Sequence, residues 1–430
     1  MRVRTGLVLA LAAGLALAAC GDDDDDDDAA GGSAPVGTTA PAPTAAAATT
    51  AAADATDATD ATGSAPATGD CALDEPLTIG YAADFSDLGG FADVPGSEAA
   101  QVQVDLLNEA GGVGGQQVEY VVKELPSDPS GAQRAAQEML DDGVDAIIGP
   151  PFSYNGAPLI DAVDGQVPII SNASTDLALV DPARGAFLMS FSDPVQAAAA
   201  AEFATGGGAT TAVTFSSPDD SYFTNTTAAF ADAFEEAGGD VVQDFTFSLA
   251  DEDFSAQVNE LASLDPQPDV LYTAMVMPGA GVLLQQMAAA GLEDIQVIGA
   301  DAFDATVVWS AGDAADGVSF TAHTFPRDDN GVQAFLDAAA AADVTIDTVS
   351  FGALASDVVR VFAAAAEQAC SVEGAALIEA IAAIEDLEVT TGTVTYAGTN
   401  GVPEKDVVIL TVEGGAPAFT DAFRPAYIPS

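Results

Sequence analysis

The chain has few positive charges and few of the side chains on which most enzymes depend. Its 430 residues contain nine Lys and Arg against 67 Asp and Glu, a formal net charge of −58 at pH 7, and only one histidine, His323. A chain this negative repels phosphate backbones, which excludes nucleic acid as a partner. Gly-x-Ser-x-Gly, a metal-binding histidine pair and a phosphate loop are all missing. We therefore predict neither an enzyme nor a bound metal or cofactor. A hydrolase that works with carboxylates alone, Asp301 beside Asp304, stays open.

The N-terminal apolar run is too short to span a membrane. Residues 6–19 have the length of the apolar part of an export signal and follow Arg2 and Arg4. The run ends in Leu-Ala-Ala-Cys at 17–20, and small residues before a cysteine are what lipoprotein processing requires. We predict a signal peptide over residues 1–20, a lipid on Cys20 and a location on the outer face of the cell membrane. An ordinary signal peptide with an incidental Cys20 is the alternative.

Residues 21–70 contain almost no large apolar side chain. Seven aspartates at 22–28 precede a tract of Ala, Thr, Pro, Gly and Ser, a composition that cannot bury enough surface to fold. We predict a disordered acidic tether that spans on the order of 40 Å. A calcium site in the aspartate run is the alternative, but it lacks the spaced oxygen ligands and turn glycine of such sites.

Cysteine is scarce, and its few positions are informative. Besides Cys20 the chain has only Cys71 and Cys370. In an oxidising compartment we expect these two to pair, which would tie the start of the folded body to the end of a helix near 352–369. Two buried free thiols are the alternative.

The remaining 360 residues exceed the usual size of one hydrophobic core and suggest two lobes. Eleven of the acidic residues lie before residue 71, so the body carries 56 against seven Lys and Arg. Because salt screens the mutual repulsion of such charges, a saline or alkaline habitat is one hypothesis. The alternative is that acidity is simply the usual composition of the organism's proteins.

Short β-branched runs alternate with amphipathic stretches, which is typical of parallel strands crossed over by helices. The predicted strands of a first set are 77–81, 117–123, 144–149 and 167–171, with helices at 97–109 and 128–141. Asp128 and Pro129 are suited to cap and begin the second of these helices. A second set has strands at 211–215, 241–245, 270–274 and 296–299, with helices at 224–237, 254–264 and 281–290.

The last part of the body repeats the pattern. Residues 318–323 and 407–412 are predicted as strands, and 331–341 and 351–369 as helices. We expect these later elements to return to the first lobe and complete it. The predicted fold class is α/β, with two doubly wound parallel-sheet lobes.

Ligands of doubly wound sheets bind beyond the carboxyl ends of the strands, where helix N-termini offer free N–H groups. The loops at these ends carry the candidate ligand-binding residues: Ser86, Phe91, Phe152, Ser153, Ser174, Thr175, Tyr222, Met275, Met277 and Asp301. Hydroxyls on one lobe and Asp301 on the other would suit the carboxylate and the ammonium of a zwitterion. The alternatives are plain helix capping for the hydroxyls and a surface carboxylate for Asp301.

Residues 77–430 resemble the type I periplasmic binding proteins, in the branch of the leucine/isoleucine/valine-binding protein of ABC importers. The resemblance is carried by 77–80, 108–113, Asp128-Pro129, 142–149, 170–173 and 299–301 in that order. It implies two lobes joined by three crossings, near 190–193, 321–323 and 397–402, that close on a ligand. The expected division is 71–192 plus 321–398 for lobe 1, and 193–320 plus 399–430 for lobe 2.

The resemblance also implies roles for single residues. Ser153 and Thr175 match hydroxyls that bind a carboxylate, Ser174 adds its carbonyl or hydroxyl, and Asp301 matches the acid that binds the ammonium group. Tyr222 matches the aromatic residue of the second lobe. Met275 and Met277 stand where related amino-acid binders often carry tyrosines, which makes the expected pocket more apolar. An apolar amino acid is therefore expected, with an aromatic or other apolar carboxylate, or an amide, left open.

The predicted function is that of a lipid-anchored, monomeric solute-binding protein that delivers its ligand to the permease of an ABC importer. Its contact with the membrane would be through the lipid alone. The alternative is a ligand-sensing receptor component of the same fold.

Overall fold

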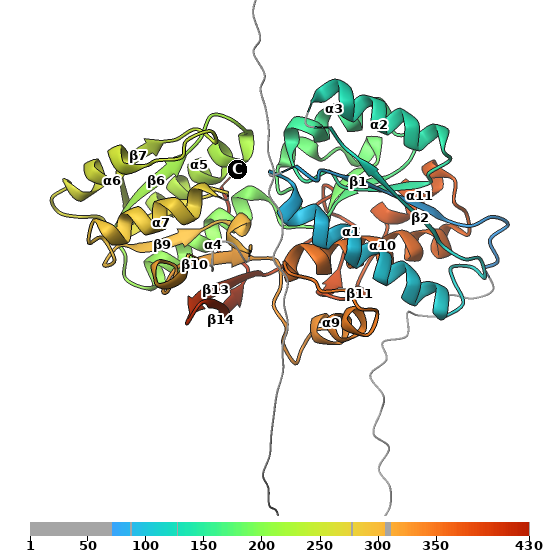
Figure 1. Ribbon diagram of the computed structural model, residues 1–430. Helices are drawn as coiled ribbons and strands as arrows, with labels where there is room; N and C mark the ends of the chain where they lie inside the picture. The colour runs from blue at the N-terminus through green and yellow to red at the C-terminus, as the bar shows by residue number, and fades with distance from the viewer. Residues whose placement is uncertain (1–70, 87, 127, 277, 306–310, 430) are drawn as a thin grey trace, which may run out of the picture. The chain divides into compact units, whose positions relative to one another are not determined.

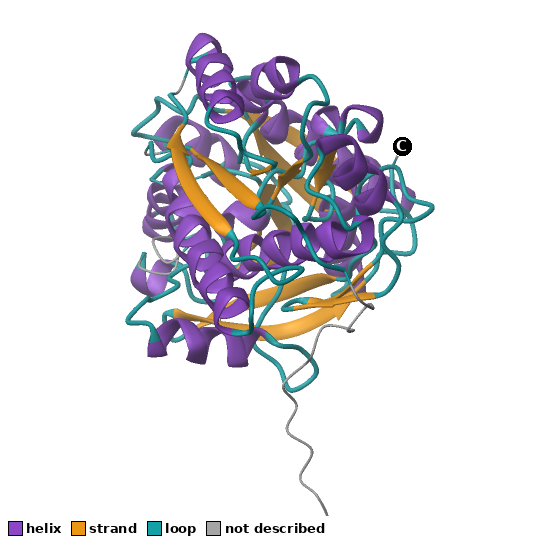
Figure 2. Cartoon of the chain, turned by 90° about the vertical axis from the view of Figure 1, so that its right-hand side faces the viewer, coloured by secondary structure: helices purple, strands orange, loops and turns teal. Residues whose placement is uncertain are grey.

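The computed structural model describes residues 71–86, 88–126, 128–276, 278–305 and 311–429. The predicted signal peptide, Cys20, the tether at 21–70 and Met277 lie outside these residues. Within them, strands form two large sheets, each accompanied by helices (Figure 1), and the turned view in Figure 2 shows strands enclosed by helices.

The first sheet has five parallel strands in the order β2-β1-β3-β4-β5. They are β1 (Thr78–Ala83), β2 (Glu119–Glu124), β3 (Ala146–Ile148), β4 (Ile169–Ser171) and β5 (Ala186–Leu188). Strand order reverses between β1 and β3, which is the switch point where such sheets bind ligands.

Helices cover both faces of this sheet because its central strand β3 is apolar and buried at every position. Ala146 and Ile148 of β3 pack in a cluster with α1 (Gly90–Glu109), α10 (Val349–Ala369) and α11 (Gly374–Ala382). Ile147 between them packs with α2 (Pro129–Asp141) and α3 (Ser153–Val163). As expected, Pro129 is the first residue of α2, and the Asp128 side chain accepts a hydrogen bond from the Gly131 N–H at 2.9 Å.

The second sheet has seven strands in the order β14-β13-β10-β9-β8-β6-β7. They are β6 (Thr211–Ser216), β7 (Asp240–Thr246), β8 (Val270–Thr273), β9 (Gln296–Gly299), β10 (Ser319–Ala322), β13 (Val407–Glu413) and β14 (Ala416–Phe423). The strands from β6 to β10 run parallel, and β13 and β14 are antiparallel to their neighbours. Its helices are α4 (Asp193–Gly206), α5 (Ser221–Glu236), α6 (Ser255–Ala262) and α7 (Gly279–Ala289).

The strand and helix pattern led us to expect all late elements in the first lobe, and this is wrong for the strands. The division implied by the family resemblance had instead given residues 399–430, which include β13, to lobe 2. β10 and β13 join the second sheet, where β10 pairs with β9 on one side and β13 on the other. Their residues are buried on both faces, so they fit only inside a sheet that has helices on both sides. The late helices α9 (Val332–Ala341), α10 and α11 do lie with the first sheet.

The chain therefore passes between the sheets three times: after β5, after β10, and between β12 (Gly392–Val394) and β13. β12 pairs with β11 (Leu387–Val389) in a hairpin, and Tyr396 just after it packs in the core of the first sheet.

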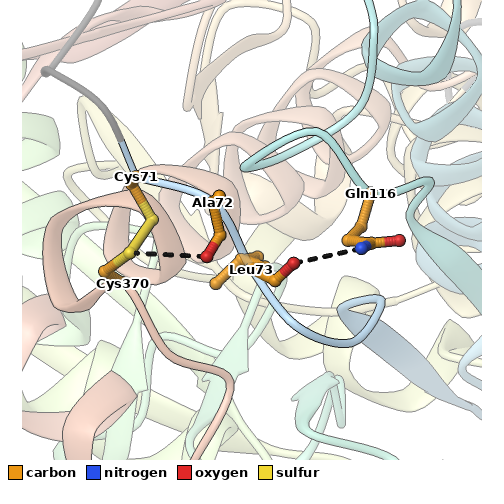
Figure 3. Close-up of a disulfide and its surroundings, with 5 residues drawn as sticks. All are labelled: Cys71, Ala72, Leu73, Gln116 and Cys370. Carbon is orange, nitrogen blue, oxygen red and sulfur yellow. Dashed lines mark hydrogen bonds between the residues drawn. A yellow bond between two sulfur atoms is a disulfide. The ribbon is translucent and has the colours of Figure 1, made fainter.

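Cys71 and Cys370 form the predicted disulfide (Figure 3). Cys370 caps the C-terminus of α10, and the segment after Cys71 is held by a hydrogen bond of 3.0 Å from Gln116 Nε2 to the Leu73 carbonyl. The bridge thus ties the first described residue to the longest helix of the core.

Of the helices in the described part of the chain, α10 alone is long and apolar enough to cross a membrane. Because 83% of its most apolar 18-residue stretch is buried inside the protein, we interpret α10 as a helix of the hydrophobic core.

Candidate functional site

A cavity lies where loops at the carboxyl ends of strands in both sheets meet. It is lined by Phe91, Ala92, Pro151, Phe152, Ser153, Ala173, Ser174, Thr175, Asp176, Tyr222, Asp301, Ala302 and Phe351. The loops after β3 and β4 and the start of α1 supply the side of the first sheet. The first turn of α5 and the turn after β9 supply the other side.

The structure brings seven of the ten predicted ligand-binding residues to this cavity. They are Phe91, Phe152, Ser153, Ser174, Thr175, Tyr222 and Asp301. Whether they bind a ligand stays a prediction. Within each sheet their grouping follows from the topology, because parallel strands end at one edge of a sheet. The approach of the two sheets brings the two groups together.

Ser86 and Met275 do not line the cavity, and Met277 lies outside the described residues. The Ser86 hydroxyl accepts hydrogen bonds from the Leu88 and Gly89 N–H groups and so shapes the loop before α1. Met275 is 1% exposed and packs in the core of the second sheet. The side chains of Ser86 and Met275 therefore stabilise the local fold and do not face the cavity.

Aromatic rings form much of the cavity wall. The centroid of Phe91 lies 6.4 Å from that of Phe152 and 5.3 Å from that of Phe351, and Phe152 lies 6.1 Å from Tyr222. Phe152 comes from the first lobe and Tyr222 from the second. Their contact closes the wall across the two sides.

The hydroxyls expected to bind a ligand's carboxylate already donate to carboxyl groups of the chain. Ser153 Oγ donates to Asp176 Oδ2 at 2.5 Å, and Thr175 Oγ1 donates to Asp193 Oδ1 at 2.5 Å. Burial raises the pKa of Asp193 well above its usual range, and this outweighs the opposing hydrogen bond from Thr175. Ser174 differs, because its carbonyl accepts from Ser190 Oγ at 2.5 Å.

Asp176 also links the two sides of the cavity. Its Oδ2 accepts a second hydrogen bond, of 2.7 Å, from Ser221 Oγ. Ser153 and Ser221 are the first residues of α3 and α5. One carboxylate oxygen therefore lies at the N-termini of two helices, which favour negative charge.

Three groups form hydrogen bonds with Asp301, which lines the cavity from the side of the second sheet. Oδ1 accepts from the Tyr222 hydroxyl at 2.7 Å, Oδ2 lies 2.9 Å from His323 Nε2, and the Asp301 N–H donates to Gln196 Oε1 at 3.0 Å. Burial lowers the pKa of His323 more than Asp301 raises it. A neutral ring whose Nε2–H donates to Asp301 does not cancel a negative charge there.

Gly299 allows the chain to turn sharply after β9, just before Asp301. A Cβ at Gly299, the last residue of β9, would lie 2.2 Å from Cγ of Phe303. The chain can therefore fold Phe303 back under the strand end, which leaves Asp301 facing the cavity.

The sequence analysis missed two residues that matter to the cavity. Asp176 directly follows the predicted Thr175, so its place in a strand-end loop is a signal that could have found it. Phe351 lies near the start of α10, far from the other lining residues in the sequence. The packing of α10 beside α1 brings Phe351 to the cavity.

In the described part of the chain, no group of three or more His, Cys, Asp or Glu side chains could hold a metal ion. The chemistry of the cavity is that of apolar contact, hydrogen bonding and charge.

A family model described as "Periplasmic binding protein" matches residues 76–416. The chain is 27% identical over 325 residues to the Leu/Ile/Val-binding protein BraC3 of Rhizobium johnstonii, covering 74% of this chain and 86% of that one. A leucine-binding protein LivK from Thermotoga maritima MSB8 has a similar structure, with TM-score 0.72 and 25% identity over 81% of this chain and 99% of the other.

The substrate-binding protein LivJ of the branched-chain amino acid transporter of Streptococcus pneumoniae, in complex with isoleucine, shares the fold. Its TM-score is 0.73 at 24% identity, covering 82% of this chain and all of that one. These relatives bind substrates and are not enzymes, and the family name implies an extracytoplasmic location. The chain belongs to the periplasmic binding protein family, type I, in the branch of the Leu/Ile/Val-binding proteins.

Proposed function

We propose that the chain is a lipid-anchored extracytoplasmic solute-binding protein that captures a small apolar solute of the amino-acid class and passes it to an ABC permease. The observation that carries the proposal is a cavity to which both lobes contribute, with Asp301 and four aromatic rings among its lining residues. A carboxylate facing apolar rings suits an amino group attached to an apolar body. The curated relative is named for leucine, isoleucine and valine, which fit this description.

Capture requires the lobes to separate and close. The free volume of the cavity is about 20 Å³, room for about one water molecule. A solute the size of leucine can enter only if the contacts across the cavity open, such as Ser221 with Asp176. We place the hinge at the three crossings, near 190–193, 321–323 and 397–402, between lobes of residues 71–192 plus 321–398 and 193–320 plus 399–430. The closed form would then dock on the permease.

A lipid on Cys20 and the tether at 21–70 would hold the monomeric protein at the outer face of the membrane. This part of the proposal rests on the sequence pattern alone. Metabolic labelling with a palmitate analogue tests it: the wild-type chain should take up the label and Cys20→Ser should not. Label on both chains, or on neither, would contradict it.

A thermal-shift screen of apolar amino acids and their amides and amines tests the capture of a solute. A ligand well above its dissociation constant stabilises the protein that binds it, by about 2.7 kcal/mol at a hundredfold excess. We expect at least one of these solutes to raise the melting temperature. No shift from any of them would contradict the proposal.

A further inference from the structure

We propose that the cavity selects a cationic amine with a branched apolar body over the zwitterionic amino acid of the same shape. This inference rests on the proposed function and names the charge of its solute. An amino-acid amide or a simple alkylamine would be such a ligand.

The first argument is charge. Asp176 and Asp301, 3% and 2% exposed, both line the cavity. None of the lining residues that the structure describes is a Lys, an Arg or a His. His323 is the one histidine of the chain and contacts Asp301, but burial lowers its pKa, which disfavours a positive charge there. A ligand with positive charge is attracted by this arrangement, and a carboxylate on the ligand finds no counter-charge.

The second argument is that an internal carboxylate already occupies the place expected for the ligand's carboxylate. Asp176 Oδ2 accepts the hydroxyl hydrogens of Ser153 and Ser221, the first residues of α3 and α5, at 2.5 and 2.7 Å. Asp176 Oδ1 accepts from the Ala178 N–H at 2.8 Å. Opening of the lobes breaks the bond to Ser221 for any solute. A zwitterion would in addition have to bring a second carboxylate against Asp176 or displace it from Ser153 and the Ala178 N–H, and either change costs free energy.

The third argument comes from the aromatic wall. Phe91, Phe152, Tyr222 and Phe351 present rings to one small space, with neighbouring centroids 5.3 to 6.4 Å apart. Ring faces attract cations within about 6 Å and repel anions, because the quadrupole of the ring is negative on its face. The rings can cover both the alkyl part of an amine and the edge of its ammonium group while Asp301 binds the N–H donors.

Four ligands of one shape and different charge test the inference: L-leucine, L-leucinamide, 3-methylbutylamine and 4-methylpentanoate. Their dissociation constants are measured by isothermal titration calorimetry with the full mature chain at about pH 6.5, where an α-amino group is protonated. We expect leucinamide and 3-methylbutylamine to bind at least about tenfold tighter than leucine, and 4-methylpentanoate not to bind.

Asp176→Asn is the matched variant, because it removes one negative charge and keeps an oxygen that can accept from Ser153 and Ser221. We expect it to bring the affinities of leucine and leucinamide about tenfold closer together. Asp313→Asn, an exposed position, is the control and should leave their ratio unchanged.

The outcomes separate the inference from the proposed function. Leucine binding as tightly as leucinamide, or an unchanged ratio in Asp176→Asn, overturns the charge preference and leaves capture of an amino acid standing. If none of the four binds, both the charge preference and the proposed class of solute are overturned.

Discussion

Asp93 is a buried acid in the first turn of α1, and its protonation is coupled to folding. Its Oδ1 accepts from the Tyr81 hydroxyl at 3.0 Å, and its Oδ2 accepts from the Asp84 N–H at 2.6 Å. Burial raises the pKa of Asp93 to about 8, against these hydrogen bonds, which lower it. Between about pH 4 and pH 8 the folded protein therefore keeps a proton that the unfolded chain has already released.

The sign of the pH dependence follows from that difference. Because the folded state binds more protons across this window, the contribution of Asp93 to the free energy of unfolding falls as pH rises. Asp93→Asn keeps an acceptor for Asp84 and removes the titration. We expect urea denaturation to show that raising the pH from 5 to 8 destabilises the wild type more than Asp93→Asn. Equal losses in the two proteins would contradict the assignment.

Residues of the site were predictable where their position after a predicted strand is enough to place them at the edge of a sheet. Ser153 and Thr175 follow predicted strands of the first sheet and Asp301 follows one of the second, so each could be placed at the carboxyl edge of its own sheet. Their hydrogen-bond partners Asp176 and Asp193 were not assigned, because a pairing between a hydroxyl and a carboxylate depends on side-chain packing that no spacing encodes.

At the scale of elements, the bridge between Cys71 and Cys370 stabilises the attachment of the first described segment to α10. It closes a loop with a sequence separation of 299 residues, for which the chain-entropy model gives a stabilisation of roughly 5 kcal/mol. We expect the double variant Cys71→Ser, Cys370→Ser to unfold at lower urea, with a loss of about 2–5 kcal/mol.

Reduction provides the matched comparison for this prediction. Adding a reductant should lower the stability of the wild type toward that of the double variant and leave the variant unchanged. A double variant as stable as the oxidised wild type would show that the bridge contributes nothing.

Helices with one polar and one apolar face were predictable from the sequence. Helices that are buried on all sides were not. Asp128 and Pro129 mark the start of α2 locally, and the predicted helix there is confirmed. Helix α4 was missed because every residue from Ala197 to Ala201 is buried, so it has no polar face to set a helical period. The strands β10 and β13 were recognised as strands, but their pattern alone suggested the wrong sheet, since pairing partners are decided by tertiary packing. Only the family resemblance assigned residues 399–430 to the second lobe.

At the scale of the whole molecule, the large negative net charge is the feature expected to affect stability most. A net charge of −58 destabilises the compact state through repulsion, and salt screens it, with a Debye length of about 10 Å at 0.1 M and about 3 Å at 1 M. We expect the free energy of unfolding to increase between low salt and molar NaCl. Choline chloride at equal ionic strength separates general screening from an effect of sodium. A stability that is flat or falling with salt would contradict this expectation.

The two-lobed α/β architecture was predictable from the alternation of strand and helix patterns together with the family resemblance. The collapsed state of the cavity was not, because it depends on how far the lobes approach one another. The same negative field has a functional consequence, since it draws cations toward the cavity and repels anions.

The central claim is that Asp301 holds the amino group of a solute between the two lobes. Isothermal titration calorimetry with leucinamide on the wild type, Asp301→Asn and the exposed control Asp313→Asn tests it most directly. Loss of a desolvated charge pair costs about 2–5 kcal/mol, so we predict that Asp301→Asn weakens binding by at least thirtyfold and that Asp313→Asn binds like the wild type. Equal affinity in Asp301→Asn and the wild type would contradict the account.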